Sequence, residues 1–382
     1  MTHALHLTTW HPAIDGISGV FVVEQCAALM SQGAQIGLIF SRIQGLRDMS
    51  PKRFLRGLPA MVHQSDPVPS FGFKSWNIPG MNGCVQPFNS HMLSNRYSAY
   101  VRVHGSPDIL HAHVAIESGV AARAISRRTG LDYVVTEHSS EILNGNMQSA
   151  RINMARKVYA DARCVIAVSR PLADRISNIC PSANVVVINN LVRDGVFQLK
   201  RKYQNQSQTL RIVTIGALVA HKKTKNAMLA LSALPEALKS RVEHHIIGGG
   251  PDRQKLDELA AQNGVKTRFH GIIPHLDAMA ILSQADLLLH SSSYETFGVV
   301  LAEAMALGVP VTATRCGGPE FIVTEKTGKL VPIDDVPALT QAVNEVLNHI
   351  EHWRKNNTAI SQYAEKNYHE KHVSSLILDT YR

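Results

Sequence analysis

The stretch from Ser291 to Glu320 reads SSSYETFGVVLAEAMALGVPVTATRCGGPE, and its order of residue types predicts the local fold. An apolar run just before it, Ala285 to Leu289, indicates a buried strand. A loop with a glutamate comes next, then a short helical run that ends at Gly308, a Gly-Pro turn and a β-type run from Val309 to Ala313. This order is one αβ repeat of an open parallel sheet.

Two glutamates flank the expected start of that helix. Glu295 lies in the loop, and Glu303 lies about one and a half turns into the helix at 3.6 residues per turn. The first N–H groups of such a helix face the crevice at the carboxyl ends of the strands, where phosphates bind. Glu303 could there accept two hydrogen bonds from a ribose diol, so the pair indicates a nucleotide-sugar clamp. Solvated surface charges are the alternative, which the apolar neighbours of Glu303 disfavour.

The composition is that of a globular protein with room for two domains. Of 382 residues, 45% are hydrophobic, and the apolar runs are shorter than the roughly 18 to 20 residues that cross a bilayer. The first ten residues lack the basic start and apolar core of a signal peptide. The five cysteines are widely spaced without C-x-x-C pairs, so we expect reduced thiols in a cytoplasmic protein.

The formal net charge of +9 suggests anionic partners. The basic residues lie in small groups without interleaved aromatics or a nucleic-acid motif, so nucleic acid is not an expected partner. We favour phosphate binding together with peripheral contact with an anionic membrane. The alternative is that the excess charge only aids solubility.

The first forty residues predict a strand, a loop, a helix and a second strand. Ala4 to Thr8 is the first strand, and Phe21 to Gln32 is a helix that closes at Gly33. Gly16 and Gly19 lie in the loop between them, where glycine would let the backbone approach a ligand closely. An ordinary flexible turn is equally consistent with this pattern.

The regular pattern fades between Arg42 and Arg102. Prolines and aromatic residues are interrupted there by basic ones, and we expect an irregular loop subdomain that packs its own aromatics. Phe54 and Leu55, beside basic neighbours, could alternatively form a short amphipathic surface for lipid headgroups. No side chain of this stretch identifies an acceptor.

Two histidines follow predicted strands. The strand Ile109 to His111 leads into a loop at His113 and a helix from about Ala115 to Gly130, and the strand Tyr133 to Thr136 leads to His138. Both histidines therefore fall at carboxyl ends of strands, the edge where ligands bind in such sheets. A structural or solvated role is the alternative for each.

A polar stretch from Gln198 to Thr209 lacks apolar periodicity and predicts a linker. A second α/β series follows, with strands at Arg211 to Ile215 and Glu243 to Ile247. Gly248 to Gly250 then separates a strand from a helix, as close approach to a phosphate requires. A plain tight turn is the alternative there.

With these residues in place, the chain resembles the retaining glycosyltransferases of family four, which have the GT-B fold. The most specific piece is SSYETFGVVLAEAMALGVPV followed by CGGPE, similar to the family's E-x7-E signature. Supporting pieces are SGVFVVEQ, ILHAH, VVTEHSSE, VIAVSRPLADRI, VINNLVRDGVF and IIGGGP. The resemblance covers nearly the whole chain, with 49–102 matching least.

The expected fold class is α/β, with two Rossmann-like, doubly wound parallel-sheet domains facing a cleft. We expect residues 1–200 to form the acceptor-side domain, joined by a C-terminal helix at about 365–382. Residues 207–364 would form the nucleotide-sugar donor domain.

The resemblance also implies roles for single residues. Glu303 should bind the ribose hydroxyls of the nucleotide, and Glu295 the hydroxyls of the donor sugar. Further donor-side residues are Phe297, Gly298 and Val299, with backbone amides for sugar and pyrophosphate, Gly249 near the donor and Ile273 near its base. On the amino-terminal side, His113 should lie near the sugar at the reaction centre, Gly19 near the phosphates, and His138 along the cleft.

One departure from the family pattern concerns the pyrophosphate. The family commonly has an arginine just after the glycine that matches Gly216 and a lysine five or six residues later. Here Ala217 takes the arginine position, which leaves Lys222 or Lys223 as the cation. Loss of one cation would weaken stabilisation of the leaving group.

The resemblance implies transfer with retention of anomeric configuration, without a metal ion or another cofactor. We expect a UDP- or GDP-sugar donor and a glycan or lipid-linked oligosaccharide acceptor, in surface polysaccharide biosynthesis at the inner face of the cell membrane. One alternative is a non-catalytic nucleotide-sugar-binding partner of another transferase, which Ala217 motivates. A nucleotide-sugar epimerase is another, although carboxylates poised for its proton transfer are not apparent in the sequence.

Overall fold

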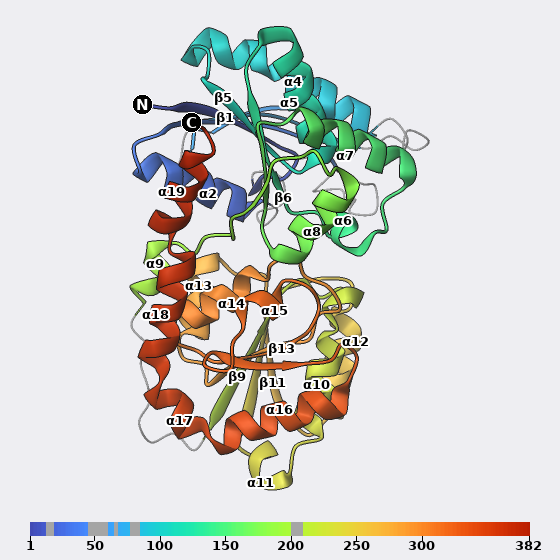
Figure 1. The fold of residues 1–382 in the computed structure, drawn as a ribbon. Helices are drawn as coiled ribbons and strands as arrows, with labels where there is room; N and C mark the ends of the chain where they lie inside the picture. Colours follow the sequence, from blue (N-terminus) through green and yellow to red (C-terminus); the bar gives the residue numbers. More distant parts are fainter. Residues whose placement is uncertain (13–18, 45–59, 65–67, 77–84, 200–208) are drawn as a thin grey trace. The chain divides into compact units, whose positions relative to one another are not determined.

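The computed structural model describes residues 1–12, 19–44, 60–64, 68–76, 85–199 and 209–382. The chain divides into two compact units: unit 1 is Met1–Asn189 with Glu370–Arg382, and unit 2 is Asn190–His369. Each unit is a sheet covered by helices (Figure 1). The predicted domain boundaries lie close to these divisions.

The sheet of unit 1 contains eight of the described strands. In spatial order they are β3 (Ala60–Gln64), β4 (Ser70–Trp76), β2 (Gln35–Gln44), β1 (His3–Thr8), β5 (Ile109–His113), β6 (Tyr133–Glu137), β7 (Cys164–Ala167) and β8 (Val185–Val187). Neighbouring strands are parallel except that β3 pairs antiparallel with β4 at one edge. Strands β1, β5, β6 and β7 are buried throughout, as expected for central strands with both faces covered.

Helices cover both faces of this sheet. They are α2 (Val20–Ser31), α4 (Val85–His104), α5 (Val120–Thr129), α6 (Ser140–Asn144), α7 (Ser149–Asp161), α8 (Arg170–Ile179) and α19 (Glu370–Asp379). In Figure 1, α4, α5 and α7 lie on one face, and α2 and α19 lie together on the other. The last helix of the chain thus packs beside the first helix of this unit.

The expectation of an irregular subdomain between Arg42 and Arg102 is wrong for the described residues, which form β3, β4 and the long helix α4. Pro87 stands in the first turn of α4, where proline costs no hydrogen bond, so it did not break the helix. Leu93, Tyr97 and Tyr100 are buried at helical spacing. Phe54 and Leu55 lie outside the described residues, as does Gly16.

A second difference concerns the helix expected from Ala115. Residues Ala115–Gly119 form an irregular π-type turn, and the regular helix α5 begins only at Val120. Val114 and Glu117 adopt positive φ angles of 66° and 68°, which non-glycine residues rarely do. His113, expected in a loop, is the last residue of β5.

Unit 2 has a six-stranded sheet in which all neighbours are parallel. In spatial order the strands are β11 (Lys266–Gly271), β10 (Val242–Ile247), β9 (Leu210–Ile215), β12 (Leu287–His290), β13 (Val311–Thr314) and β14 (Gly328–Val331). The helices are α9 (Asp194–Phe197), α10 (Thr224–Ser232), α11 (Glu236–Lys239), α12 (Arg253–Ala260), α13 (His275–Leu282), α14 (Val299–Ala306), α15 (Pro319–Ile322), α16 (Val336–Asn348), α17 (Ile350–Lys355) and α18 (Asn357–Tyr368). The predicted order of strand, loop, helix and strand is confirmed as β12, α14 and β13.

Strand order locates the ligand crevice of each unit. In unit 2 the chain runs outward from β9 through β10 to β11, then returns to the other side of β9 with β12. In unit 1 it reverses in the same way between β1 and β5. Ligands of doubly wound sheets bind beyond the carboxyl ends of the strands at such a reversal. The prediction of two doubly wound parallel sheets is confirmed.

Candidate functional site

Glu295 lies in the loop after β12, at the strand reversal of unit 2. Its N–H donates to the Cys316 carbonyl at 2.9 Å, and its own carbonyl accepts from the Gly318 N–H at 2.8 Å. Gly318 has to be small because an added Cβ would lie 2.4 Å from the carbonyl oxygen of Phe297. The two ends of the Ser291 to Glu320 stretch are therefore pinned to each other, which fixes the backbone that carries the glutamate.

The Glu295 carboxylate is mostly buried, with 14% of its side chain exposed. Its Oε1 forms an ion pair with Nζ of Lys222 and accepts hydrogen bonds from His290 Nε2 at 3.0 Å and from Ser292 Oγ at 2.9 Å. Burial alone would raise the pKa of Glu295, but Lys222 and His290 together hold it well below its ordinary value. The carboxylate is therefore ionised at neutral pH and is not a solvated surface charge.

The two candidate lysines point to different partners. Lys222 ends a short 3₁₀ turn after β9 and pairs with Glu295, across the strand reversal. Lys223, in a left-handed conformation with φ 50°, pairs with the exposed carboxylate of Asp334 at 3.0 Å. Lys222 is thus the lysine beside the clamp glutamate. Ala217 lies in the same loop and brings no charge.

Glu303 projects from the second turn of α14, and the residue is 8% exposed. Its Oε1 accepts a hydrogen bond from His275 Nε2 at 2.7 Å, and among the described residues no donor reaches its Oε2. Gly298, with φ 93°, precedes the helix, and Phe297 is buried against Tyr368 at 5.6 Å between ring centroids. The backbone amides at this helix start are fixed from behind by a packed aromatic pair.

Gly249 and Ile273 follow the neighbouring strands β10 and β11. The Gly248 N–H donates to the Gly271 carbonyl at 2.8 Å, so the two strand ends are joined. An added Cβ at Gly249 would lie 3.0 Å from the Ile272 side chain. The structure therefore gathers all the predicted donor-side residues at the carboxyl edge of one sheet.

Unit 1 holds the remaining predicted residues. Gly19 precedes α2 with φ 78°, and an added Cβ there would lie 2.3 Å from the carbonyl oxygen of Trp10. His113 is completely buried, and its Nδ1 lies 3.3 Å from Nε2 of the half-buried His138. His138 lines a pocket, and His113 stands behind it.

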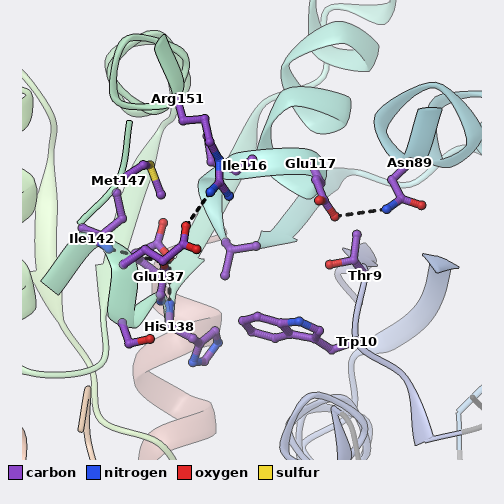
Figure 2. A pocket seen from close by; sticks show the side chains of 14 residues that line it. Thr9, Trp10, Asn89, Ile116, Glu117, Glu137, His138, Ile142, Met147 and Arg151 are labelled. Carbon is purple, nitrogen blue, oxygen red and sulfur yellow. Dashed lines mark hydrogen bonds and ion pairs between the residues drawn. The ribbon is translucent and has the colours of Figure 1, made fainter. Parts of the chain in front are cut away.

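That pocket has a volume of about 420 Å³ and lies at the strand reversal of unit 1 (Figure 2). It is lined by Thr9, Trp10, Asn89, Val114, Ile116, Glu117, Glu137, His138, Ser139, Ser140, Glu141, Ile142, Met147 and Arg151. Trp10 and His138 lie beside each other, with ring centroids 6.2 Å apart. The lining combines an aromatic face with carboxylates and hydroxyls, groups that suit a polyhydroxylated ligand.

A buried carboxylate shapes the pocket wall. Glu137 accepts hydrogen bonds from the backbone N–H groups of Ala115, His138 and Ser139 at 2.9 to 3.0 Å and from the Tyr159 hydroxyl at 2.6 Å. Burial raises the pKa of Glu137, and these four donors partly oppose that rise. The carboxyl group joins the loops after β5 and β6, so its role is to hold them.

Sequence reasoning missed several of these residues. His275 opens the helix after β11, so its place after a strand end was the available signal. Trp10 likewise follows β1 by two residues. Glu117 carried no such signal, because its position depends on the irregular turn.

Two family descriptions match the chain and together span most of it. The 4-like domain of glycosyl transferases matches residues 18–190, and glycosyl transferases group 1 matches residues 196–367. The chain belongs to the family 4 glycosyltransferases. The division between the two matches falls where unit 1 gives way to unit 2.

Known family members support this assignment. N-acetyl-alpha-D-glucosaminyl L-malate synthase of Bacillus anthracis is 25% identical over 383 residues, covering 98% of this chain and 94% of that protein. Sucrose-phosphate synthase from Thermosynechococcus elongatus has a similar structure, with a TM-score of 0.80 at 19% identity over 100% of this chain and 98% of that one. Anabaena HepE in complex with UDP-glucose gives 0.71 at 18% identity over 100% and 99%. The fold is therefore GT-B.

Two searches of the structure found nothing. Among the described residues, no cluster of three or more His, Cys, Asp or Glu side chains is arranged to hold a metal ion. No helix in the described part of the chain is long and apolar enough to span a bilayer.

Proposed function

We propose that this glycosyltransferase moves a sugar from a UDP- or GDP-sugar to a glycan or lipid-linked acceptor, with retention and without a metal ion. The observation that carries the proposal is the arrangement around α14 of unit 2. Two buried glutamates, each already paired with a cation or a histidine, flank a helix start at the strand reversal. The fold it shares with the UDP-glucose complex of HepE supports a nucleotide-sugar donor.

The site supplies the interactions that a nucleotide sugar needs. Glu303, with an oxygen that no described donor reaches, would accept from the ribose hydroxyls, and His275 would hold the carboxylate in place. The first N–H groups of α14 and Lys222 would stabilise the negative charge of the pyrophosphate. As Lys222 turns toward phosphate, Glu295 would accept instead from the hydroxyls of the sugar.

The transfer step itself needs few protein groups. The bond between the anomeric carbon and the pyrophosphate oxygen breaks as the bond to the acceptor oxygen forms on the same face of the sugar. The acceptor proton passes to the departing phosphate oxygen, so atoms and charge balance. Positioning and electrostatic stabilisation of the leaving group then carry the catalysis.

The pocket of unit 1 is the proposed acceptor site. Trp10 offers an apolar face for a sugar ring, and Glu117 and Ser139 offer partners for hydroxyl groups. An acceptor of this kind fits a role in surface polysaccharide or other glycoconjugate synthesis, at the cytoplasmic face of a membrane that the basic chain would contact.

One observation favours a second candidate, a non-catalytic partner that binds nucleotide sugar. Ala217 replaces a cation, and Lys222 is already engaged by Glu295. Such a protein would bind the donor but leave it intact. Binding and turnover therefore have to be measured separately.

The first experiment is thermal unfolding with UDP, GDP, ADP and their sugar conjugates. A ligand at 100 times its Kd stabilises the folded protein by about 2.7 kcal/mol, which raises the melting temperature by roughly 5 to 10 °C in a unit of this size. The expected result is a preference for one base that is lost in Glu303→Ala and kept in Glu236→Ala, a matched change of an exposed glutamate. No shift with any nucleotide would contradict the donor site, and a shift without sugar transfer would favour the non-catalytic candidate.

A further inference from the structure

Four histidines of unit 1 form one hydrogen-bonded chain behind the pocket. They come from β1, β5 and the residue after β6: His6, His111, His113 and His138. His6 Nδ1 lies 3.0 Å from His113 Nε2, and His113 Nδ1 lies 3.3 Å from His138 Nε2. Three of the four rings are completely buried, and His138 reaches the pocket.

Two hydroxyl groups complete the chain at its far end. The Tyr381 hydroxyl lies 3.2 Å from His6 Nε2 and 2.6 Å from His111 Nδ1. The Thr136 hydroxyl lies 2.6 Å from His111 Nε2. Six side chains thus connect in the order Thr136, His111, Tyr381, His6, His113 and His138.

Each member of this chain has a single proton to donate. Burial lowers the pKa of His6 and His138 to about 3 and those of His111 and His113 further, so all four rings are neutral at physiological pH. A neutral imidazole donates from one nitrogen and accepts at the other. If every contact is to be a hydrogen bond, all protons must point the same way along the chain.

The Thr136 end selects the direction. Thr136 is 2% exposed, and among the described residues its hydroxyl has no acceptor other than His111 Nε2. If His111 donated to Thr136, the hydroxyl proton would be buried without a partner, which is unfavourable. Thr136 therefore donates to His111, His111 to Tyr381, Tyr381 to His6, His6 to His113, and His113 to His138.

We propose that Thr136 and Tyr381, acting through His111, His6 and His113, fix His138 as a hydrogen-bond donor that presents its Nδ1–H at the pocket. They are positioning residues, because His138 alone among them lines the pocket. The ligand group that meets His138 must then be an acceptor, such as a hydroxyl, ether or carbonyl oxygen of the sugar acceptor. This last step rests on the proposed function, whereas the proton order does not.

The proton order can be read directly in the full chain labelled with ¹⁵N-histidine. Long-range ¹H–¹⁵N correlation spectra distinguish the two tautomers of each ring. The expected result is the Nδ1–H form for all four rings. Free histidine favours the Nε2–H form, so a merely packed cluster would not give this signature. An Nε2–H form or a protonated ring at neutral pH for any of the four would overturn the proposal.

Tyr381→Phe tests the coupling, and Tyr133→Phe is its matched control. Tyr133 is also buried in unit 1, but its hydroxyl donates to the Val158 carbonyl outside the chain. In Tyr381→Phe, His6, His113 and His138 are expected to lose the uniform Nδ1–H form together, while the control keeps it. Unchanged tautomers in a folded Tyr381→Phe variant would refute the coupling.

A kinetic readout links the chain to the acceptor. Loss of one fixed hydrogen bond predicts about a threefold to tenfold rise in the KM for acceptor in Tyr381→Phe, with the KM for donor unchanged. An unchanged acceptor KM despite altered tautomers would contradict the role at the pocket. If the protein transfers no sugar at all, the proposed function fails, and the tautomer spectra still decide the proton order.

Discussion

Removing the charge of Lys222 should destabilise unit 2 and leave a pH signature. In Lys222→Met the buried Glu295 carboxylate loses its cation. Breaking a buried ion pair from one side costs about 3 to 5 kcal/mol, and here His290 and Ser292 still donate to the carboxylate. We therefore expect a loss of about 2 to 3 kcal/mol in the free energy of unfolding near pH 7.5.

The pH dependence separates charge from packing. In the native protein the pKa of Glu295 is depressed, so its stabilising effect is present above the unfolded pKa and is lost only as pH falls through the folded value. In Lys222→Met burial dominates, and the pKa of Glu295 rises. The carboxyl group can then take up a proton near pH 5, and the gap between variant and native protein should narrow there.

Urea denaturation of four proteins measures this effect. They are the native chain, Lys222→Met, Glu295→Gln and the double variant, compared at about pH 7.5 and about pH 5. The double variant should recover much of the loss, because it leaves no unpaired buried charge. Equal losses at both pH values, with additive single and double variants, would refute an interaction between the two charges.

Two further predictions follow from geometry. Gly318→Ala should cost about 1 to 3 kcal/mol in the free energy of unfolding, because its Cβ would meet the Phe297 carbonyl oxygen, whereas Gly195→Ala, with no atom within 4 Å, should cost little; equal effects in urea denaturation would contradict the close approach. Lys223→Ala should leave nucleotide affinity within about twofold, since its partner Asp334 is exposed, while Lys222→Ala should weaken it about tenfold or more in calorimetric titration; the reverse order would assign the phosphate to Lys223.

Local periodicity was enough to predict the central strands and the start of α14. Runs such as Ala4 to Thr8 and Tyr133 to Thr136 are apolar because both faces of each sheet are covered, and the structure extends each by one residue. The helix α4 was missed because proline was read as a breaker without regard to its place in the first turn. A proline's effect depends on which turn it occupies, which the residue type alone does not state.

The site was predictable as a set of positions but not as a set of contacts. Parallel strands bring their carboxyl ends to one edge, so Glu295, Glu303 and Lys222 could be assigned to the same crevice from sequence. The ion pair of Lys222 with Glu295 spans 73 positions in the chain, and the bond of Tyr381 to His111 spans 270. Partners so distant depend on side-chain packing across elements, which residue spacing does not encode.

The return of the last helix to unit 1 also sets an order for folding during synthesis. The segment Glu370–Arg382 follows all of unit 2 in the chain, yet α19 packs on α2, and Tyr381 completes the hydrogen bonds of the buried histidines. Unit 2 can fold while the ribosome is still elongating the chain, but unit 1 must wait for its final residues. Until then α2 and the rings of His6 and His111 lack their covering, so the amino-terminal half depends most on chaperones although it is made first.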